Sequence, residues 1–467
     1  MTKSPALAVA DVDFVIPGAL GRSVWRGRLL LLSALVVAEV AWIAGQAHLQ
    51  GGARWLPVLG VIAVHLHLVS AERRQPVLSP GVVIWATVMV AVGAVVIAPF
   101  GSRDLFQYAM YGRMVAEHGL SPYTTVPSAV PGDPLLAQLA PAWQHTSSVY
   151  GPVFTAVSAV GARFYGGSPL LARLYFQGLA AAALVAGVIY GRIRAMSSAS
   201  LILMGLSPVL VAVVNGGHND LLVGVLVLVG VDLGARGRTG WGGTALGLAC
   251  AIKLLALPVV VVVIAAWVMA RNWRAVASTL ASFAAVLGVA YVAAGGTDAL
   301  RPLLSLGGHR SRASVWSALG SAFPQLGLHG TALTGVSGII AIGAGAAVLA
   351  RSRPSRSSVD PAYLAVAVGT SACFVAPYLL PWYPAVFLPL SARCIGSVPQ
   401  RALALGSTFL LVAYVQPPGR PAQELILAPT VALLAGLTVG AAALWIVVSR
   451  PEWPEQPTRL GGRGDRS

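Results

Sequence analysis

Apolar runs of membrane-spanning length recur along almost the entire chain, and they constrain the fold more than any other feature. Hydrophobic residues make up 57% of the 467 residues, and charged residues only 10%. A soluble fold of this length needs more charge than that to cover its surface. Runs of about 20 apolar residues have the length that a helix needs to cross a bilayer. The sequence therefore predicts an all-α, polytopic integral membrane protein.

The positions of the arginines predict which ends of the spans face the cytoplasm. The net charge of +16 comes mainly from arginines in short loops between apolar runs, such as Arg73 and Arg74. Basic loops of this kind mark the inner side of a membrane, and they explain the charge better than a nucleic-acid partner does. The pattern predicts about 13 to 14 transmembrane helices, with both termini in the cytoplasm.

The predicted organisation is one transmembrane domain between two tails. Residues 1–25 and 450–467 are expected to be cytosolic tails, and residues 26–449 the membrane domain. Two polar segments interrupt the domain on the predicted extracytoplasmic side, and we call residues 99–168 the first polar segment and residues 295–329 the second. An apolar stretch inside the first is too short to span, so it is expected to form a juxtamembrane helix.

The first polar segment carries the strongest catalytic candidate. The chain has only 15 Asp and Glu residues, and Asp104 lies at the predicted membrane edge where a helix begins. Asp104, Tyr108 and Tyr111 follow helical spacing, so their side chains share one face. A carboxylate beside phenols is suited to accept a proton from a hydroxyl while aromatic rings bind a sugar. An ordinary helix N-cap is the alternative interpretation.

A second polar cluster, Asn215-Gly-Gly-His-Asn-Asp220, interrupts apolar sequence between two predicted spans. Polar groups at membrane depth are costly, which makes such a cluster a candidate functional site. The alternative is a tight hairpin in which Asn219 or Asp220 caps the next helix. Four polar side chains exceed what one cap requires. Substrate binding is therefore expected of Asn215, His218, Asn219 and Asp220.

Cations on the predicted outer side are candidates for binding phosphate. Lys253 is the only lysine within the apolar body, and a compact charge there suits a phosphate headgroup. His309, Arg310 and Arg312 in the second polar segment break the positive-inside trend and would suit a phosphate clamp. The alternatives are that Lys253 extends to the membrane interface and that the loop cations are simply solvated.

An aromatic and proline-rich stretch, Pro377 to Pro384, lies between two predicted spans, the second at residues 383–395. Trp382 and Tyr383 within it would form either a rigid wall for a sugar or isoprenoid, or an ordinary interfacial aromatic belt.

Other polar groups in the apolar body have no predicted chemical role. Glu39 lies within the first span, where a hydrogen bond to a neighbouring helix is expected. Cys250, Cys373 and Cys394 lack the spacing of a metal site or a disulfide framework, so they are expected to be packing residues.

Three of these segments together resemble the polyprenyl-phosphate-mannose-dependent α-1,6-mannosyltransferases of actinobacteria, which are membrane glycosyltransferases of the GT-C class. The resemblance covers roughly residues 80 to 390. Its motifs are Asp104-Leu-Phe-Gln-Tyr108, Gly119-Leu-Ser-Pro-Tyr123 and Tyr150-Gly-Pro152 in the first polar segment, then Asn215-Gly-Gly-His-Asn-Asp220, and then Pro381-Trp-Tyr383.

The resemblance implies a GT-C fold and inverting transfer of mannose from a polyprenyl phosphate to a lipid-anchored, lipomannan-type α-1,6-mannan on the outer leaflet. It implies that Asp104 is the general base, that Tyr123 belongs to the substrate site, and that His218 and Asp220 hold the acceptor or the phosphate side of the donor. GT-C enzymes often carry two adjacent acids in this loop, whereas Arg103 precedes Asp104 here. We therefore expect no obligatory metal and no cofactor.

Other functions remain open at this stage. A secondary transporter or flippase of a cell-envelope lipid would use intramembrane groups such as Glu39 and Lys253 for coupling, although the chain shows no internal repeat. A scaffold subunit of an envelope-synthesis complex would tolerate replacement of Asp104. Among enzymes, the sequence leaves the sugar open between mannose and arabinofuranose.

Overall fold

The computed structural model describes residues 18–46, 55–305, 311–323, 325, 331–351, 360–414 and 427–448. These residues form helices and connecting turns without any strand, which confirms the predicted all-α class. Within this described part, five helical segments are long and apolar enough to cross a membrane, and six shorter apolar helices accompany them. The fold is that of a polytopic membrane protein. The number of spans stays a prediction.

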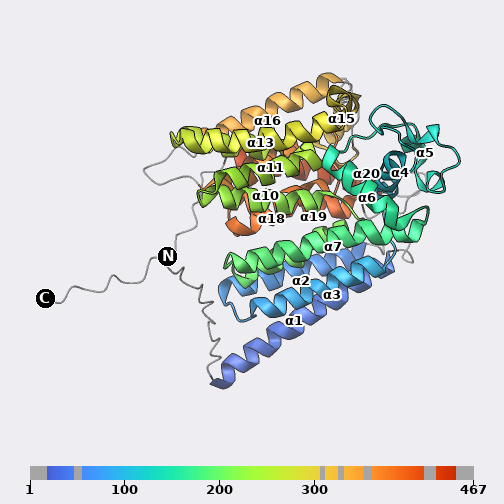
Figure 1. Ribbon diagram of the computed structural model, residues 1–467. Helices are drawn as coiled ribbons and strands as arrows, with labels where there is room; N and C mark the ends of the chain where they lie inside the picture. The colour runs from blue at the N-terminus through green and yellow to red at the C-terminus, as the bar shows by residue number, and fades with distance from the viewer. Residues whose placement is uncertain are drawn as a thin grey trace, which may run out of the picture.

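One side of the bundle is a group of long, roughly parallel rods (Figure 1). Its first helix packs on the second and third, and the third packs on the seventh. Ser79 and Ser168 start two of these helices by accepting a hydrogen bond from a backbone N–H in the first turn. The four helices are α1 (Gly18–Gly45), α2 (Trp55–Arg74), α3 (Pro80–Val96) and α7 (Pro169–Ile193).

The other side of the bundle contains the central and C-terminal helices. α11 packs between α10 and α13, and a Cβ at Gly243 of α11 would overlap the backbone of Thr279, so glycine permits this close approach. The members are α10 (Asp220–Ala235), α11 (Thr239–Ile252), α12 (Leu257–Met269), α13 (Trp273–Ala293), α16 (Thr331–Arg351), α17 (Pro361–Phe374), α19 (Val398–Ala413) and α20 (Leu427–Val448). Two further helices, α8 (Ser198–Gly205) and α9 (Pro208–Asn215), pack mainly on α2, α3 and α7 of the first side.

The predicted span at residues 383–395 does not form one continuous helix, so this prediction is wrong. Pro384 and Pro389 lack the backbone N–H that a continuous helix needs, which explains the interruptions. The stretch consists of a 3₁₀ turn at Tyr383–Val386, the short helix α18 at Leu388–Ser391, and a second 3₁₀ turn at Ala392–Cys394.

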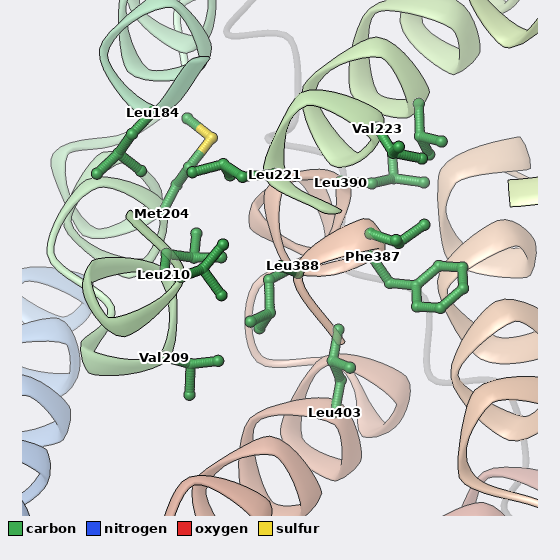
Figure 2. Close-up of a cluster of buried hydrophobic side chains, with 14 of the residues drawn as sticks. Leu184, Met204, Val209, Leu210, Leu221, Val223, Phe387, Leu388, Leu390 and Leu403 are labelled. Atoms are coloured by element: carbon green, nitrogen blue, oxygen red, sulfur yellow. The ribbon is translucent and has the colours of Figure 1, made fainter. Parts of the chain in front are cut away.

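This interrupted stretch is nevertheless part of the hydrophobic core. Figure 2 shows Phe387, Leu388 and Leu390 among side chains of α10 and α19, including Leu221 and Leu403. All five side chains are buried. The stretch is therefore anchored in the core of the bundle, and Trp382 directly precedes it.

The first polar segment folds at one end of the bundle, as Figure 1 shows. Asp133 ties the segment together, because it accepts hydrogen bonds at 2.8 Å from both Arg113 and His118. Burial alone would raise the pKa of Asp133, but these hydrogen bonds lower it. The helices are α4 (Asp104–Ala116), α5 (Pro141–Gln144) and α6 (Pro152–Tyr165), and α6 is the expected short helix.

The second polar segment is described only in part. It contains the short helices α14 (Arg301–Ser305) and α15 (Val315–Ala322), and α15 packs on α20. Asp298 forms an exposed ion pair with Arg301, at 3.4 Å.

We call the end that carries Asp104 the site end, and the other the arginine end. At the arginine end, the buried Asp232 accepts hydrogen bonds from Tyr190 at 2.8 Å and from Arg236 at 3.1 Å, and it pairs with Arg194 and Arg393. Basic loops therefore gather opposite Asp104, as the positive-inside pattern requires. Which end faces the cytoplasm stays a prediction.

Glu39 does not behave as expected. Its side chain is fully buried in α1, but neither carboxyl oxygen has a hydrogen-bond partner among the described residues. The expected hydrogen bond to a neighbouring helix is therefore wrong for the described part of the bundle.

Candidate active site

Asp104 is the first residue of α4, directly after the chain turns away from α3. Gly101 makes this turn with a φ of 81°, a left-handed conformation that glycine adopts easily. The backbone N–H of Asp104 donates to the hydroxyl oxygen of Ser102 at 3.1 Å. Arg103, not Asp104, occupies the N-cap position, and no side chain caps the helix. The carboxylate of Asp104 is therefore free of the capping role that was its alternative.

Asn215 fixes the chain that leads into Asp104. Its amide nitrogen donates to the backbone oxygens of Ala94 and Ile97, and its amide oxygen accepts from the N–H of Phe100. Carbonyl groups at the end of a helix have no partner within the helix, so Asn215 satisfies those of α3. All the side-chain hydrogen bonds of Asn215 go to this turn, so it supports the chain that leads to Asp104; the substrate binding predicted for it stays a prediction.

His218 faces Asp104 from the connection between α9 and α10. Its Nδ1 lies 3.8 Å from Oδ2 of Asp104 and 3.5 Å from the hydroxyl of Tyr108. Its ring is stacked on that of Trp382, with centroids 3.9 Å apart and planes 15° apart. Burial, followed by the charge of Lys253, lowers the pKa of His218 well below its usual value. The imidazole is therefore neutral at pH 7, and it orients neighbours rather than carrying charge.

Lys253 and Asp220 form a buried ion pair beside Asp104. The Nζ of Lys253 donates to Oδ1 of Asp220 at 2.7 Å and lies 4.2 Å from the ring centroid of Tyr383. Lys253 has an extended backbone between α11 and the following 3₁₀ turn, so its side chain turns into the bundle. In the structure Lys253 pairs with Asp220 and packs on Tyr383; its predicted phosphate role stays a prediction.

Three buried polar atoms beside this pair lack hydrogen-bond partners among the described residues. Oδ2 of Asp220 and both amide atoms of Asn219 are buried and make no hydrogen bond within the described ranges. Buried polar atoms without partners are rare in proteins, and a ligand is one way to satisfy them. Asn219 and Asp220 therefore retain capacity to bind a polar ligand.

The Asp104 carboxylate titrates near neutral pH. Burial raises its pKa to about 6, whereas the hydrogen bond from Ser102 and the charge of Lys253 lower it and the charge of Asp220 raises it. The side chain still has 17% of its surface exposed, so a substrate can reach it. A carboxylate with a pKa near the working pH is well suited to general-base catalysis.

A cavity of about 180 Å³, which we call the first cavity, joins these groups. Its walls include Asp104, Lys253, Trp382 and Tyr383, which come from α4, the end of α11 and the proline-rich stretch. Tyr150 also lines it, because the N–H of Gly151 donates to the backbone oxygen of Ile252. A Cβ at Gly151 would overlap the backbone oxygen of Ala251, so glycine is required for this approach.

The predicted sugar-binding tyrosines lie behind the first cavity rather than in its wall. Tyr108 is buried with its ring edge-to-face against Tyr150, at 4.7 Å between centroids. The hydroxyl of Tyr111 donates to the backbone oxygen of Thr146 at 2.7 Å, and that of Tyr123 to the backbone oxygen of Tyr150 at 3.1 Å. Direct sugar contact by these three residues stays untested, and their contacts support Tyr150.

None of the three cations predicted in the second polar segment lines the first cavity in the part of the chain that the structure describes. His309 and Arg310 lie outside the described residues. Arg312 is described and exposed, and it is not among the residues that line the first cavity.

Sequence reasoning did not assign Ser102 or Tyr150 to the site. Ser102 stands two residues before Asp104 and bonds to it, so its polarity at the membrane edge was the available signal. Tyr150 belongs to the Tyr150-Gly-Pro152 motif of the resemblance, but no role was predicted for it. Among the described residues no group of three or more His, Cys, Asp or Glu side chains is arranged to hold a metal ion.

The fold and these contacts define a class: a polytopic helical membrane protein with a buried acid, imidazole and amine at one end of its bundle. Residues 15–271 match the family described as alpha-(1->6)-mannopyranosyltransferase, N-terminal domain. Because the match covers more than half of the chain, the chain belongs to this family. The matched residues include Asp104, His218, Asp220 and Lys253, but not Trp382 or Tyr383.

Individual relatives agree with this family. The chain is 30% identical over 185 residues to alpha-(1->6)-mannopyranosyltransferase A of Mycobacterium tuberculosis, covering 38% of this chain and 34% of that protein. It is 31% identical over 173 residues to alpha-(1->6)-mannopyranosyltransferase A of Corynebacterium glutamicum, covering 35% of each. The chain thus spans about a third of the length of these curated relatives. No solved structure matches the chain.

Proposed function

We propose that the protein is an inverting mannosyltransferase that uses polyprenyl-phosphate-mannose and extends a lipid-anchored α-1,6-mannan on the outer face of the membrane. The observation that carries the proposal is that the Asp104 carboxylate and the Lys253 amine both line the first cavity. Membership of a mannopyranosyltransferase family supports an enzyme over the transporter and scaffold alternatives.

The chemistry needs one base and one stabilised leaving group. The acceptor hydroxyl oxygen forms a bond to the anomeric carbon of mannose, and its proton passes to the Asp104 carboxylate. The bond from the anomeric carbon to the phosphate oxygen breaks, and the electron pair leaves with the polyprenyl phosphate. Lys253 faces the negative charge that develops on that phosphate, which is where a fixed cation gives most stabilisation.

The neighbours of Lys253 hold it ready for a phosphate. An ammonium group has three N–H donors, of which one bonds to Asp220. The Tyr383 ring lies beneath the same nitrogen. Asp220 therefore positions the cation, while the remaining donors are available to the donor phosphate. Asp220 was predicted to bind substrate directly. We now propose that it also positions Lys253, which binds the donor phosphate.

The charge distribution supports the proposed extracytoplasmic location. Positive-inside topology puts the arginine end in the cytoplasm and the site end outside. A test is maleimide labelling of intact cells that carry Ser128→Cys in the first polar segment or Arg238→Cys in the loop after α10. The native cysteines are buried and give a low background. Ser128→Cys should label from outside, and Arg238→Cys only after permeabilisation; the reverse result would invert the topology.

The function itself is tested by transfer of radiolabelled mannose from polyprenyl-phosphomannose to a short α-1,6-mannoside. Purified parent protein, Asp104→Asn and Asp298→Asn should be compared. Asp298 is a matched control because its exposed carboxylate belongs to the second polar segment and pairs only at the surface with Arg301. Transfer by the parent and by Asp298→Asn, but not by Asp104→Asn, is expected.

Two other outcomes would change the proposal. Full transfer by Asp104→Asn would remove Asp104 as the base. Absence of transfer by the parent would count against mannose, and the arabinofuranosyl donor would then be tried with the same three proteins.

A further inference from the structure

A second cavity shares Trp382 with the first. It has a volume of about 160 Å³, and Phe100, Ser102, Ala212, His218 and Tyr414 are among the residues that line it. Trp382 is the one described residue that lines both cavities, and its ring is stacked on His218, which lines only the second.

We propose that the second cavity binds the acceptor, as the terminal mannose of the α-1,6-mannan, while the first cavity binds the sugar phosphate of the donor. This inference rests on the proposed function and adds a separate acceptor site, with Trp382 as the partition between the two substrates.

The charges of the two cavities differ in the way that this division requires. Lys253 lines the first cavity, whereas the described lining of the second contains no lysine or arginine. A polyprenyl-phosphate donor carries an anionic phosphate, and a mannan terminus is neutral. The Lys253 cation therefore favours binding of the anionic donor in the first cavity. The second cavity has no described cation that would attract the donor.

The lining of the second cavity suits a neutral sugar. The Ser102 hydroxyl and the His218 imidazole are hydrogen-bonding groups, and both lie beside Asp104. Phe100, Trp382 and Tyr414 add aromatic surface. Binding sites for small molecules commonly combine mostly apolar walls with a few polar groups that fix orientation, and this lining has that character.

Stereochemistry gives a second, independent reason. In an inverting reaction the attacking oxygen approaches the face of the sugar opposite to the leaving group. The acceptor must therefore come from a side that the donor phosphate does not occupy. The position of Asp104 is compatible with an acceptor in the second cavity. Its carboxylate lines the first cavity, and its two neighbours, Ser102 and His218, line the second. The base lies at the boundary where the two substrates would meet.

The test blocks each cavity after the protein has folded. Ala212 is partly exposed and lines only the second cavity, and Leu255 lines only the first. Ala212→Cys and Leu255→Cys would be purified and then modified with benzyl methanethiosulfonate, with the buried native cysteines giving a low background. Ala186→Cys, at an exposed position of α7, is the control for modification without blockage.

Modified Ala212→Cys should show an acceptor KM raised roughly tenfold with the donor KM unchanged, reversed by a thiol reductant. Modified Leu255→Cys should show the opposite, and Ala186→Cys neither. A raised donor KM with an unchanged acceptor KM in modified Ala212→Cys would overturn the inference.

A binding measurement separates this inference from the proposed function. Saturation-transfer NMR with α-1,6-mannobiose alone needs no donor and no turnover. Loss of the signal on modification of Ala212→Cys supports the acceptor cavity even if the parent transfers no mannose. A signal that persists after modification, or no signal from the parent, overturns it even if the parent is an active mannosyltransferase.

Discussion

Asp232 and Asp104 are acidic residues at opposite ends of the same bundle, in opposite chemical settings. Asp232 is buried with Tyr190, Arg194, Arg236 and Arg393 around its two oxygens. Asp104 has no arginine or lysine within ion-pair distance among the described residues, and the nearest ring nitrogen, of His218, is 3.8 Å away. One carboxylate is enclosed by cations, while the other faces a cavity.

The difference separates a structural group from the group that we propose is functional. A buried carboxylate with several hydrogen-bond donors stabilises the fold, because each of its oxygens has a partner. The site end contains the less satisfied groups Asp104, Asn219 and Asp220, of which the last two retain buried atoms without described partners. Leaving a buried polar atom unpaired costs about 1–3 kcal/mol. A ligand that pairs with these atoms when it binds would explain why they are present.

The largest expected effect is loss of catalysis in Asp104→Asn. Removing a general base should lower kcat by about 10²–10⁴-fold, because the acceptor proton loses its receiver. Stability should not fall, since the amide has the same shape and the carboxylate makes no described ion pair with lysine or arginine. The measurement is single-turnover transfer together with thermal unfolding in detergent. A fall in stability with an unchanged kcat per folded molecule would make Asp104 resemble Asp232 and would remove the contrast between the two ends.

Asp232→Asn should show the reverse pattern. Removing one partner of a buried ion pair costs about 3–5 kcal/mol, because the remaining charges are left uncompensated. The free energy of unfolding should fall by that order, while kcat per folded molecule stays close to that of the parent. Unfolding is followed in detergent by denaturant titration, and kcat in the soluble folded fraction. A large fall in kcat at parental stability would show that the arginine end takes part in catalysis.

Lys253→Met should affect donor binding more than acceptor binding. A hydrogen bond to a charged group contributes about 1.5–3 kcal/mol, so the donor KM should rise roughly tenfold to hundredfold. The single variant also leaves Asp220 buried and unpaired, so its stability should fall. The double variant Asp220→Leu/Lys253→Met should recover stability but not the donor KM. Recovery of both would mean that Lys253 is only the counter-ion of Asp220.

The sequence was sufficient to predict the fold class and the two strongest site segments. Apolar runs of spanning length admit few alternatives to helices. Asp104 and the Asn215–Asp220 cluster stood out because polar groups are expensive in apolar surroundings. These two segments do meet, through His218 and Asp104. Local sequence was informative where polarity itself was the signal.

What the sequence did not predict depends on contacts between distant residues. The pairing of Asp220 with Lys253 requires α10 and α11 to pack with their site ends together. Asn215 was predicted to bind substrate because its amide is polar, yet its partners are backbone groups that only the end of α3 supplies. Prolines divided the predicted span at residues 383–395, although its apolar composition alone favoured a helix.

The pH dependence of transfer should report the setting of Asp104. Because burial raises its pKa to about 6, the carboxylate form that accepts a proton is lost as pH falls through 6, and kcat should fall with it by about tenfold per unit below that value. The contribution to stability runs the other way. A carboxyl whose pKa is raised in the folded state stabilises the fold when protonated, and this contribution diminishes as pH rises from its usual pKa through 6.

Lys253, Asp220 and His218 lie near the Asp104 carboxylate. An experiment must therefore show which of these groups causes the pH dependence of kcat. Asp104→Glu should move the midpoint of the kcat profile while retaining measurable transfer. A profile that is flat between pH 5 and 8 in the parent would contradict a base with a pKa near 6. A midpoint that is unchanged in Asp104→Glu would assign the titration to another group.

The smallest expected effect is that of Glu39→Gln, and it sharpens the comparison because Glu39 is a third type of buried acid. It has neither the cations of Asp232 nor the cavity of Asp104, and no described residue accepts or donates a hydrogen bond to its carboxyl group. Glutamine has nearly the same shape, so the free energy of unfolding should change by less than about 1 kcal/mol and mannose transfer should be unchanged. A protein that coupled transport to a proton at Glu39 would instead lose function in this variant while Asp104→Asn kept it. Measuring both variants by transfer and by flux of a labelled lipid in proteoliposomes therefore distinguishes an enzyme from a transporter with one pair of substitutions.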